Sequence, residues 1–387
     1  MSLGKESFSK RHYLIDVGVL LFGLVVFWIL ISGRCYTDIL AHTEILKLFL
    51  ASDSFPIPPL YYSFLYWTNH VIGDYWISAL IIMTLSLYLK FTLSAKYLKI
   101  ESKTEDFGIE KAKWLAIGLF FFFPIYLYKI DLSNFYFGKL TPNIWHNSTT
   151  IFCMPFVILL FWQTIKYLEG ERNALFYALA LLVLILLIKP SYLFVYLPSL
   201  LVIWIFQKMN RRNFFGILLL VIVGGIGIYI MKVSLYDQNS TLDQIAYYGE
   251  SSDVILAPFE VWSRFNPNIP LAVLSSLIWV MVVLWYYFKE LWSQLSFKLV
   301  AIQFLGAVMV WALFAESGPR MNDGNFYWQV PMSFYLLILV ITSFLIRQPI
   351  WKEHKSLRFY LISGSFALHV FSGMLYLGKY LYFGVYE

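Results

Sequence analysis

Charged residues are scarce in this chain of 387 residues, and their scarcity excludes most soluble folds. Lysine, arginine, aspartate and glutamate together make up 13% of the sequence, whereas hydrophobic residues make up 60% and aromatic residues 20%. A typical soluble domain has roughly 25% charged residues. The composition therefore predicts an integral membrane protein.

Cysteines and ligand-binding motifs are equally sparse. Cys35 follows one apolar stretch and Cys153 lies inside another, so we expect two free thiols. The sequence has no Gly-x-x-x-x-Gly-Lys loop for nucleotide phosphates, which argues against a cytoplasmic nucleotide-sugar donor. Its polar loops lack an Asp-x-Asp pair and its six histidines are scattered. No cofactor is predicted, and a divalent metal ion is not supported.

Long apolar runs fill most of the chain and predict about 11 transmembrane helices, since a helix needs about 20 apolar residues to cross a bilayer. Eight windows carry at most one charge each: 13–33, 76–95, 114–128, 149–165, 214–231, 271–288, 299–315 and 330–346. Segment 174–206 supplies two shorter halves, and 358–387 supplies the last span. Without a soluble domain or a repeat, residues 1–387 are predicted to form one all-α, polytopic transmembrane domain.

The distribution of basic residues predicts the orientation of these spans. With the N-terminus in the cytoplasm, most of the 29 lysine and arginine residues fall on the cytoplasmic side, counting Lys90 at the inner end of its span. The outer face then receives the loops 34–73, 129–147, 236–270 and 316–328. We therefore predict a multi-pass protein of the bacterial inner (plasma) membrane, with its site on the extracytoplasmic face.

Lys189 and Pro190 interrupt the apolar segment 174–206. Each half would reach only about 22 Å at 1.5 Å per residue, which is short of the bilayer thickness. The turn at Lys189 is therefore expected to lie below the outer surface, where a cation is tolerated beside protein or a watery cavity. Two interpretations stay open: a functional cation, or a lysine whose ammonium reaches the outer headgroups.

The loop 34–73 follows the first span directly and contains several acidic residues. Asp38, His42 and Glu44 lie in 36–50, whose apolar face predicts a short interfacial helix. Asp38 and His42 share a face because they are four residues apart, whereas Glu44 points in a different direction. The three residues do not form a ready-made metal site.

The same loop continues with Pro58-Pro59-Leu60-Tyr61-Tyr62, which predicts a second interfacial helix. An acidic residue just after the first span, two helices parallel to the membrane and a Pro-Pro-Leu-Tyr-like element together resemble the glycosyltransferase C (GT-C) superfamily. The resemblance covers the span pattern of the first half well and that of the second half loosely. It implies an enzyme that transfers sugars to lipid or protein.

Two further outer segments carry polar side chains. Segment 141–150 contains Trp145, His146 and Asn147, although Asn147 also suits the cap of the following helix. Segment 316–328 contains an arginine between a Gly-Pro turn and an Asp-Gly turn. Their Trp-His-Asn-Ser and Glu-x-Gly-x-Arg patterns are similar to stretches of bacterial surface-polysaccharide glycosyltransferases and polymerases.

These residues suit the transfer of a sugar from a polyprenyl-phosphate or polyprenyl-diphosphate donor to a glycan or lipid-linked acceptor. A carboxylate must take the proton of the acceptor hydroxyl, and Asp38 is the candidate, with Glu44 second. Cations must meet the leaving phosphate, and the candidates are Arg320, Lys189, His146 and Arg264. The candidate substrate-binding residues are His42, Tyr61, Tyr62, Trp145, Asn147, Glu316 and Asn325. The aromatic residues among them also suit a membrane interface.

The loop 236–270 is acidic, with Asp237, Asp243, Glu250, Asp253 and Glu260 against Arg264. Its length predicts an acceptor-binding lid, although most of these acids are expected to be simply solvated.

Several functions remain open. The close alternative to a transferase is an O-antigen or capsule polymerase that joins lipid-linked repeats. The second class is a lipid-linked oligosaccharide flippase or another transporter, which the lack of paired inverted halves disfavours. The third class is a scaffold or an acyltransferase. His369, deep in an apolar span, is the one residue that suits acyl transfer, and we expect it to be a satisfied core residue.

Overall fold

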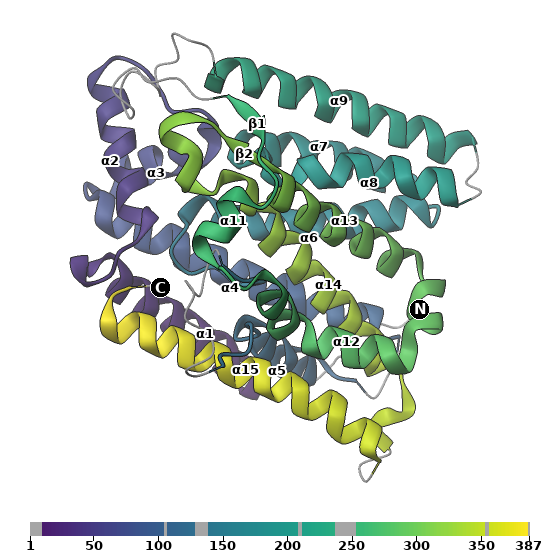
Figure 1. Cartoon of the computed structure of the whole chain (residues 1–387). Coiled ribbons are helices and arrows are strands. Elements are labelled where there is room, and N and C mark those ends of the chain that lie inside the picture. Colours follow the sequence, from purple (N-terminus) through teal and green to yellow (C-terminus); the bar gives the residue numbers. More distant parts are fainter. Residues whose placement is uncertain are drawn as a thin grey trace.

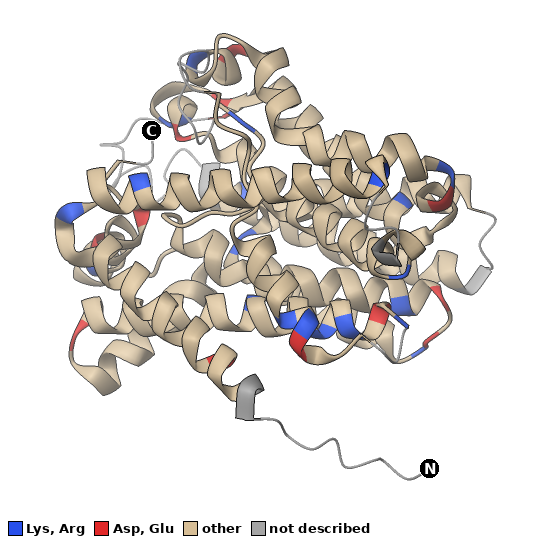
Figure 2. Ribbon diagram, turned by 90° about the horizontal axis from the view of Figure 1, so that it is seen from below, with Lys and Arg blue, Asp and Glu red and all other residues tan. Residues whose placement is uncertain are grey.

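The computed structural model describes residues 10–103, 107–127, 138–207, 211–236, 253–352 and 356–385. Helices dominate this part of the chain (Figure 1), and its two short strands, β1 (Val254–Leu256) and β2 (Phe314–Glu316), pair antiparallel. Eight of the described helices are long and apolar enough to cross a membrane. Most charged positions lie near helix ends (Figure 2). The chain is therefore an all-α protein with the helix lengths and apolarity of a membrane protein.

The eight long helices correspond to seven of the eight apolar windows and to the C-terminal span. They are α1 (Lys10–Ile29, continued by the wide turn η1, Leu30–Arg34), α4 (Tyr75–Glu101), α6 (Ser148–Leu168), α9 (Arg211–Tyr236), α12 (Ile269–Ser293), α13 (Leu295–Leu313), α14 (Gln329–Ile346) and α15 (Leu357–Phe383). Two shorter apolar helices, α7 (Ala174–Ile188) and α8 (Leu193–Phe206), meet at the turn η2 (Pro190–Tyr192). The predicted break at Lys189 is thereby confirmed, whereas the count of eleven spans stays a prediction.

Segment 114–128 does not form the full-length helix that its apolar run predicted. Helix α5 (Ile109–Phe120) has only 12 residues, and the chain has no regular secondary structure from 122 to 127. Pro124 lacks a backbone N–H and disfavours helix in the residue before it. The neighbouring helices satisfy this irregular backbone: the Ser372 hydroxyl donates to the Pro124 carbonyl (2.6 Å), and the Ile125 N–H donates to the Ser275 carbonyl (2.9 Å).

His369 also forms a hydrogen bond with the backbone of this irregular segment. Its Nδ1 lies 2.6 Å from the Phe123 carbonyl oxygen, its Nε2 accepts from the Trp279 N–H (3.3 Å), and its ring stacks on Phe122. Both ring nitrogens therefore have partners. The prediction of a satisfied core histidine is confirmed.

The connection before α6 was expected to be an outer loop, but its described part is buried at every residue from 138 to 147. A buried irregular backbone needs hydrogen-bond partners, and this one has them. Trp262 and Asn266 both donate to the Gly138 carbonyl (3.1 and 3.0 Å), and the Lys139 ammonium donates to the Ile125 carbonyl (3.0 Å). The segment therefore passes into the helix bundle, where it can position His146 and Asn147 rigidly.

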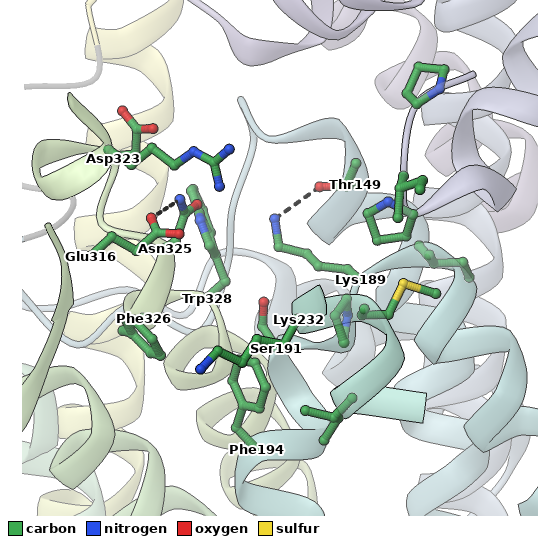
Figure 3. A pocket seen from close by; sticks show the side chains of 18 of the residues that line it. Thr149, Lys189, Ser191, Phe194, Lys232, Glu316, Asp323, Asn325, Phe326 and Trp328 are labelled. Carbon is green, nitrogen blue, oxygen red and sulfur yellow. Dashed lines mark hydrogen bonds between the residues drawn. The ribbon is translucent and has the colours of Figure 1, made fainter. Parts of the chain in front are cut away.

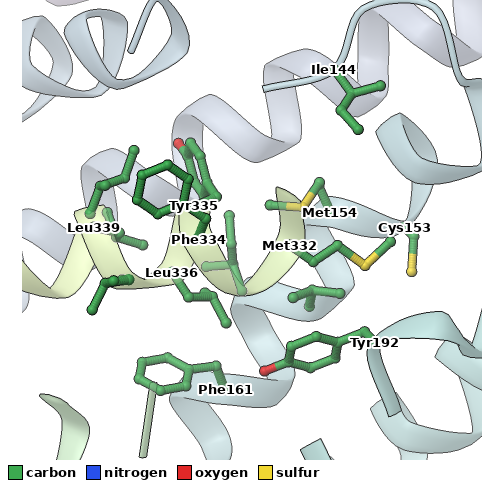
Figure 4. Packing of buried hydrophobic residues seen from close by; sticks show 14 of the residues in the cluster. Ile144, Cys153, Met154, Phe161, Tyr192, Met332, Phe334, Tyr335, Leu336 and Leu339 are labelled. Atoms are coloured by element: carbon green, nitrogen blue, oxygen red, sulfur yellow. The ribbon is translucent and has the colours of Figure 1, made fainter. Parts of the chain in front are cut away.

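Helix α14 forms the centre of the bundle. All 18 of its residues are buried, and it packs against α4, α12 and α13, among others. Figure 4 shows Phe334, Leu336 and Leu339 of α14 within the buried hydrophobic cluster, and the Phe334 ring stacks on Phe304 of α13 with ring centres 4.9 Å apart. A helix that is apolar all round is expected at such a position. Helices α1, α9 and α15, in contrast, have fewer than half of the residues in their apolar windows buried.

Lys90 does not lie at the inner end of its span, as we had expected. Its side chain is buried, its ammonium donates to Asn143 Oδ1 (2.7 Å), and its Nζ lies 3.8 Å from the centre of the Tyr335 ring. A cation inside the bundle says nothing about which side of the membrane it is near. Lys90 therefore no longer supports the predicted orientation, which was based on the number of lysine and arginine residues on each side of the membrane.

The first loop forms the two short helices that we predicted, α2 (Asp38–Ala51) and α3 (Pro59–Ile72), at one end of the bundle (Figure 1). The Thr37 hydroxyl accepts from the Ile39 N–H (3.2 Å) and so caps α2, and it donates to the His146 carbonyl (3.0 Å). Helix α2 buries one face and exposes the other, as an amphipathic helix should. The same threonine thus fixes the start of α2 against the buried segment 138–147.

Candidate functional site

A cavity of about 440 Å³ lies at the end of the bundle that carries α2, α3 and the Lys189 turn (Figure 3). Its polar and charged lining comes from elements far apart in the sequence. These residues are His42, Tyr62, Thr149, Lys189, Ser191, Lys232, Glu316, Arg320, Asp323, Asn325 and Trp328. The rest of the lining is apolar. The structure therefore brings together His42, Tyr62, Lys189, Glu316, Arg320 and Asn325, all of which the sequence had predicted as site residues.

Lys189 sits where α7 ends, and Pro190 starts the next turn, so its side chain leaves the helix axis and points into the cavity. Its ammonium donates to Thr149 Oγ1 (2.9 Å) and to Asn147 Oδ1 (3.2 Å), and it lies 4.5 Å from the centre of the Trp328 ring. Burial lowers the pKa of Lys189 to about 8, while nearby Asp38 and Cys153 act to raise it. Lys189 is therefore mostly protonated at neutral pH.

Asn147 caps α6, because its Oδ1 accepts from the Thr150 N–H (3.0 Å), so the predicted cap is confirmed. The same amide does more than cap the helix. Its Nδ2 donates to Asp38 Oδ2 (2.8 Å), while its Oδ1 also accepts from Lys189. Asp38 is half-buried and is not part of the cavity lining. One amide therefore separates the Asp38 carboxylate from the Lys189 ammonium, and we call Asp38, Asn147, Thr149 and Lys189 the Lys189 cluster.

Burial disfavours the charged form of two histidines at or near the cavity, His42 and His146. Burial lowers the pKa of both His42 and His146 to about 4. His42 Nδ1 is hydrogen-bonded to the Tyr62 hydroxyl (2.6 Å), and the His146 ring lies edge-on to Trp328 with ring centres 6.1 Å apart. A neutral ring supplies no positive charge. His146 also does not border the cavity, so the structure does not favour it as a phosphate-binding cation.

The opposite wall comes from the segment 316–328. Glu316 ends β2, where it is paired in register with Val254 of β1, and Asn325 Nδ2 donates to its Oε2. Arg320 lies in the turn η3 (Gly318–Asp323), and its side chain is buried although it borders the cavity. Figure 3 shows Glu316, Asn325 and Asp323 facing Lys189 and Thr149 across the cavity. We call Glu316, Arg320 and Asn325 the Glu316 cluster.

Glycines shape this wall as the sequence indicated. Gly318 and Gly324 have φ values of 65° and 62°, a region that favours glycine, and they bracket η3. The predicted Gly-Pro and Asp-Gly turns are thereby confirmed.

Two candidate charges lie outside the cavity. Glu44 is exposed on α2 and forms an ion pair with Lys47 (2.8 Å). Arg264 is exposed on α11 (Glu260–Phe265) and binds Glu260 (2.7 Å) and Asn322 (2.8 Å). Neither borders the cavity, so the structure does not bring them to the site.

Two candidate aromatic residues pack in the interior. Tyr61 is fully buried among His42, Tyr62 and Phe152, and burial raises the pKa of its hydroxyl to about 12. Trp145 packs against the rings of Phe22 (6.1 Å) and Phe121 (6.5 Å). Neither residue borders the cavity.

The sequence reading missed several residues of the lining. Trp328, Thr149 and Asp323 lie inside segments that were singled out, but nothing in those segments distinguished them. Lys232 is a lone cation near the end of an apolar helix, α9, and it lies 3.9 Å from Asp253 Oδ1. That isolated charge was a usable signal, of the same kind as Lys189.

The predicted lid cannot be placed as a whole. Asp237, Asp243 and Glu250 lie outside the described residues. Asp253 and Glu260 are exposed. Among the described residues, no three His, Cys, Asp or Glu side chains lie close enough together to hold a metal ion.

Comparisons with protein-family models, with curated proteins and with solved structures find no match for this chain.

Proposed function

We propose that the protein is a membrane glycosyltransferase of the GT-C type, which transfers a sugar from a polyprenyl-phosphate or polyprenyl-diphosphate donor to a hydroxyl acceptor. The reaction takes place on the extracytoplasmic face of a bacterial inner membrane, in the assembly of a cell-surface polysaccharide or glycolipid. One observation carries this proposal: a single cavity joins Lys189 and Arg320 with the buried carboxylate of Glu316.

The two cations suit a leaving phosphate. Arginine can bind two phosphate oxygens at once, and lysine adds a compact positive charge. Negative charge grows on the bridging oxygen as the bond to the sugar breaks, so cations that are already in place stabilise that transition state. Lys189 and Arg320 belong to different elements and line the same cavity, so both can face the phosphate of one bound donor.

The apolar side of the cavity suits the lipid part of the donor. Ile188, Phe194, Ile228 and Met231 contribute to it from α7, α8 and α9. Helix α9 exposes its other face, including Ile226 and Ile230, as a lipid-facing helix would. A donor with both a phosphate and a long hydrocarbon chain matches this combination better than a soluble nucleotide sugar does, because burying apolar surface is favourable.

The acceptor is a hydroxyl group of a glycan or of a lipid-linked saccharide. Where the acceptor is itself a lipid-linked repeat, the same chemistry makes the protein a surface-polysaccharide polymerase. Both variants need a base beside the acceptor and cations beside the donor phosphate, so they share one site.

The test uses the purified full chain in nanodiscs. It is incubated with radiolabelled polyprenyl-phosphate and polyprenyl-diphosphate sugars and with glycan and lipid-linked acceptors. We expect transfer by the wild type and by Arg264→Gln, a matched control at an exposed arginine, and loss of transfer in Arg320→Gln. Donor binding by the wild type without transfer to any acceptor would overturn the proposal in favour of a lipid-linked oligosaccharide flippase.

A further inference from the structure

We infer that Glu316, and not Asp38, is the carboxylate that takes the acceptor proton, and that Asp38 acts through Asn147 to orient and charge Lys189 for donor binding. This inference rests on the proposed function and deepens it. It assigns separate tasks to Glu316, which is buried and borders the cavity, and to Asp38, which is half-buried and does not border it.

Access to the substrate separates the two carboxylates. A general base must lie within hydrogen-bond reach of the proton it takes, about 2.6 to 3.2 Å between heavy atoms or one water further. Glu316 borders the cavity, whereas Asp38 does not. Asp38 Oδ2 accepts from Asn147 Nδ2 (2.8 Å), so the amide stands between this oxygen and the Lys189 side of the cavity.

The surroundings of Glu316 suit a base. Its position at the end of β2 is fixed by the β1 pairing, and Asn325 orients the carboxylate by donating to Oε2. Arg320 is only four residues further along the chain and borders the same cavity. An acceptor hydroxyl beside Glu316 would therefore lie next to a donor phosphate held by Arg320.

The reaction step balances with these groups alone. The acceptor O–H bond breaks and its proton passes to a Glu316 carboxylate oxygen, while the acceptor oxygen forms a bond to the anomeric carbon. The bond between that carbon and the phosphate oxygen breaks, and its electron pair stays on the lipid phosphate. Arg320 and Lys189 face the additional negative charge. Glu316 then releases its proton to water as the products leave.

The position of Asp38 suits a different task. Several groups face Lys189: Asp38 from α2, Cys153, Thr149 and Asn147 from α6 and its cap, and Trp328 before α14. Asp38 is the carboxylate among these groups, and its negative charge favours the protonated form of Lys189. The Asn147 amide binds both partners at once. Removing the Asp38 charge should therefore weaken phosphate binding by Lys189 and leave the proton transfer itself in place.

The experiment compares four variants of the full chain in nanodiscs: Glu316→Gln, Glu316→Asp, Asp38→Asn and the exposed control Glu260→Gln. Donor affinity is measured by equilibrium binding of the radiolabelled lipid-linked sugar, and kcat is measured at saturating donor from pH 6 to pH 9. Glu316→Gln should lower kcat by about 10² to 10⁴ while donor affinity stays within about twofold. Asp38→Asn should weaken donor binding, more so at higher pH, with kcat at saturation within about threefold of the wild type.

Glu316→Asp covers the case in which the glutamine variant does not fold. This variant, whose carboxylate is one methylene shorter, should bind donor normally and have a kcat between those of the wild type and Glu316→Gln. A wild-type kcat in Glu316→Asp would count against the inference. Loss of transfer in Asp38→Asn at saturating donor, together with wild-type transfer in Glu316→Gln, would overturn the inference and leave the glycosyltransferase standing. Absence of transfer in the wild type with every donor would overturn both.

Discussion

The two walls of the cavity are built in different ways. The Lys189 cluster joins residues 38, 147, 149 and 189, which come from three separate parts of the chain and meet through one amide. The Glu316 cluster comes from a single segment, 316–328, folded by two turns. A wall assembled through tertiary contacts can tune a charge by shared hydrogen bonds, whereas a wall made by one short segment fixes its side chains locally. This difference agrees with the division of tasks that we propose, with charge control on one wall and proton transfer on the other.

A large effect, exceeded only by that of Glu316→Gln, is expected on the wall formed by the Glu316 cluster from Arg320→Lys. Lysine keeps the positive charge but loses the planar fork that binds two phosphate oxygens. Because loss of one stabilising donor typically costs 10² to 10³ in kcat, we expect a loss of about 10²-fold even with the charge retained. Steady-state transfer rates check this, with Arg264→Lys as the matched control. A wild-type rate in Arg320→Lys would show that this wall contributes charge alone.

Asn147→Leu should change the Lys189 cluster in two ways, by lowering stability and by weakening donor binding. The change removes the cap of α6, which costs about 1 kcal/mol of stability. It also breaks the bridge between Asp38 and Lys189, so we expect donor affinity to fall roughly tenfold, since an interaction of 1.4 kcal/mol corresponds to a factor of ten. Thermal unfolding in detergent and donor binding measure the two effects separately.

A matched cap variant distinguishes these contributions. Asn268 caps α12 by accepting from the Leu271 N–H (3.1 Å) and is exposed. Asn268→Leu should therefore cost similar stability without changing donor affinity. Equal loss of donor affinity in both variants would mean that Asn147 acts only as a cap.

The two walls also differ in how far the sequence predicted them. Glu316, Arg320 and Asn325 were predicted together because they lie in one segment, and the glycine turns that shape it are visible in the sequence. Asp38, Asn147 and Lys189 were each singled out, but the bond that joins them depends on how α2, α6 and α7 pack. The sequence also could not predict that Asp38 does not border the cavity, because the spacing of residues on a helix gives its faces but not its neighbours.

The errors in the fold have physical causes of the same kind. Lys90 was assigned to the inner end of its span because sequence position does not reveal that Asn143 and Tyr335 contact its ammonium. Pro124, in contrast, was a visible stop signal inside the span predicted for 114–128. The burial of 138–147 depends on partners such as Trp262 and Asn266, which come from more than a hundred residues away.

A change of pH should alter donor affinity through the Lys189 cluster. Lys189 has a pKa of about 8, lowered by burial, so the ammonium that binds phosphate is present below pH 8 and is lost as the pH rises through that value. In the wild type, donor affinity should therefore fall by about tenfold between pH 7 and pH 9. Lys189→Arg keeps its charge over this range and should show a nearly flat profile. Donor binding measured across the range checks this, and parallel declines in both proteins would place the titrating group elsewhere.

The smallest effect is expected from Glu44→Gln, and it is informative because Glu44 is the second acid of the first loop that the sequence offered as a base. Glu44 is exposed and pairs with Lys47 on the surface of α2, and such pairs contribute about 0.3 to 0.5 kcal/mol. Transfer rates and donor affinity should therefore stay within about twofold of the wild type. If Glu44→Gln instead abolishes transfer while donor binding persists, the base belongs to α2, and the division of tasks between the two walls fails. A wild-type rate in this variant, beside a large loss in Glu316→Gln, would locate proton transfer on the Glu316 wall.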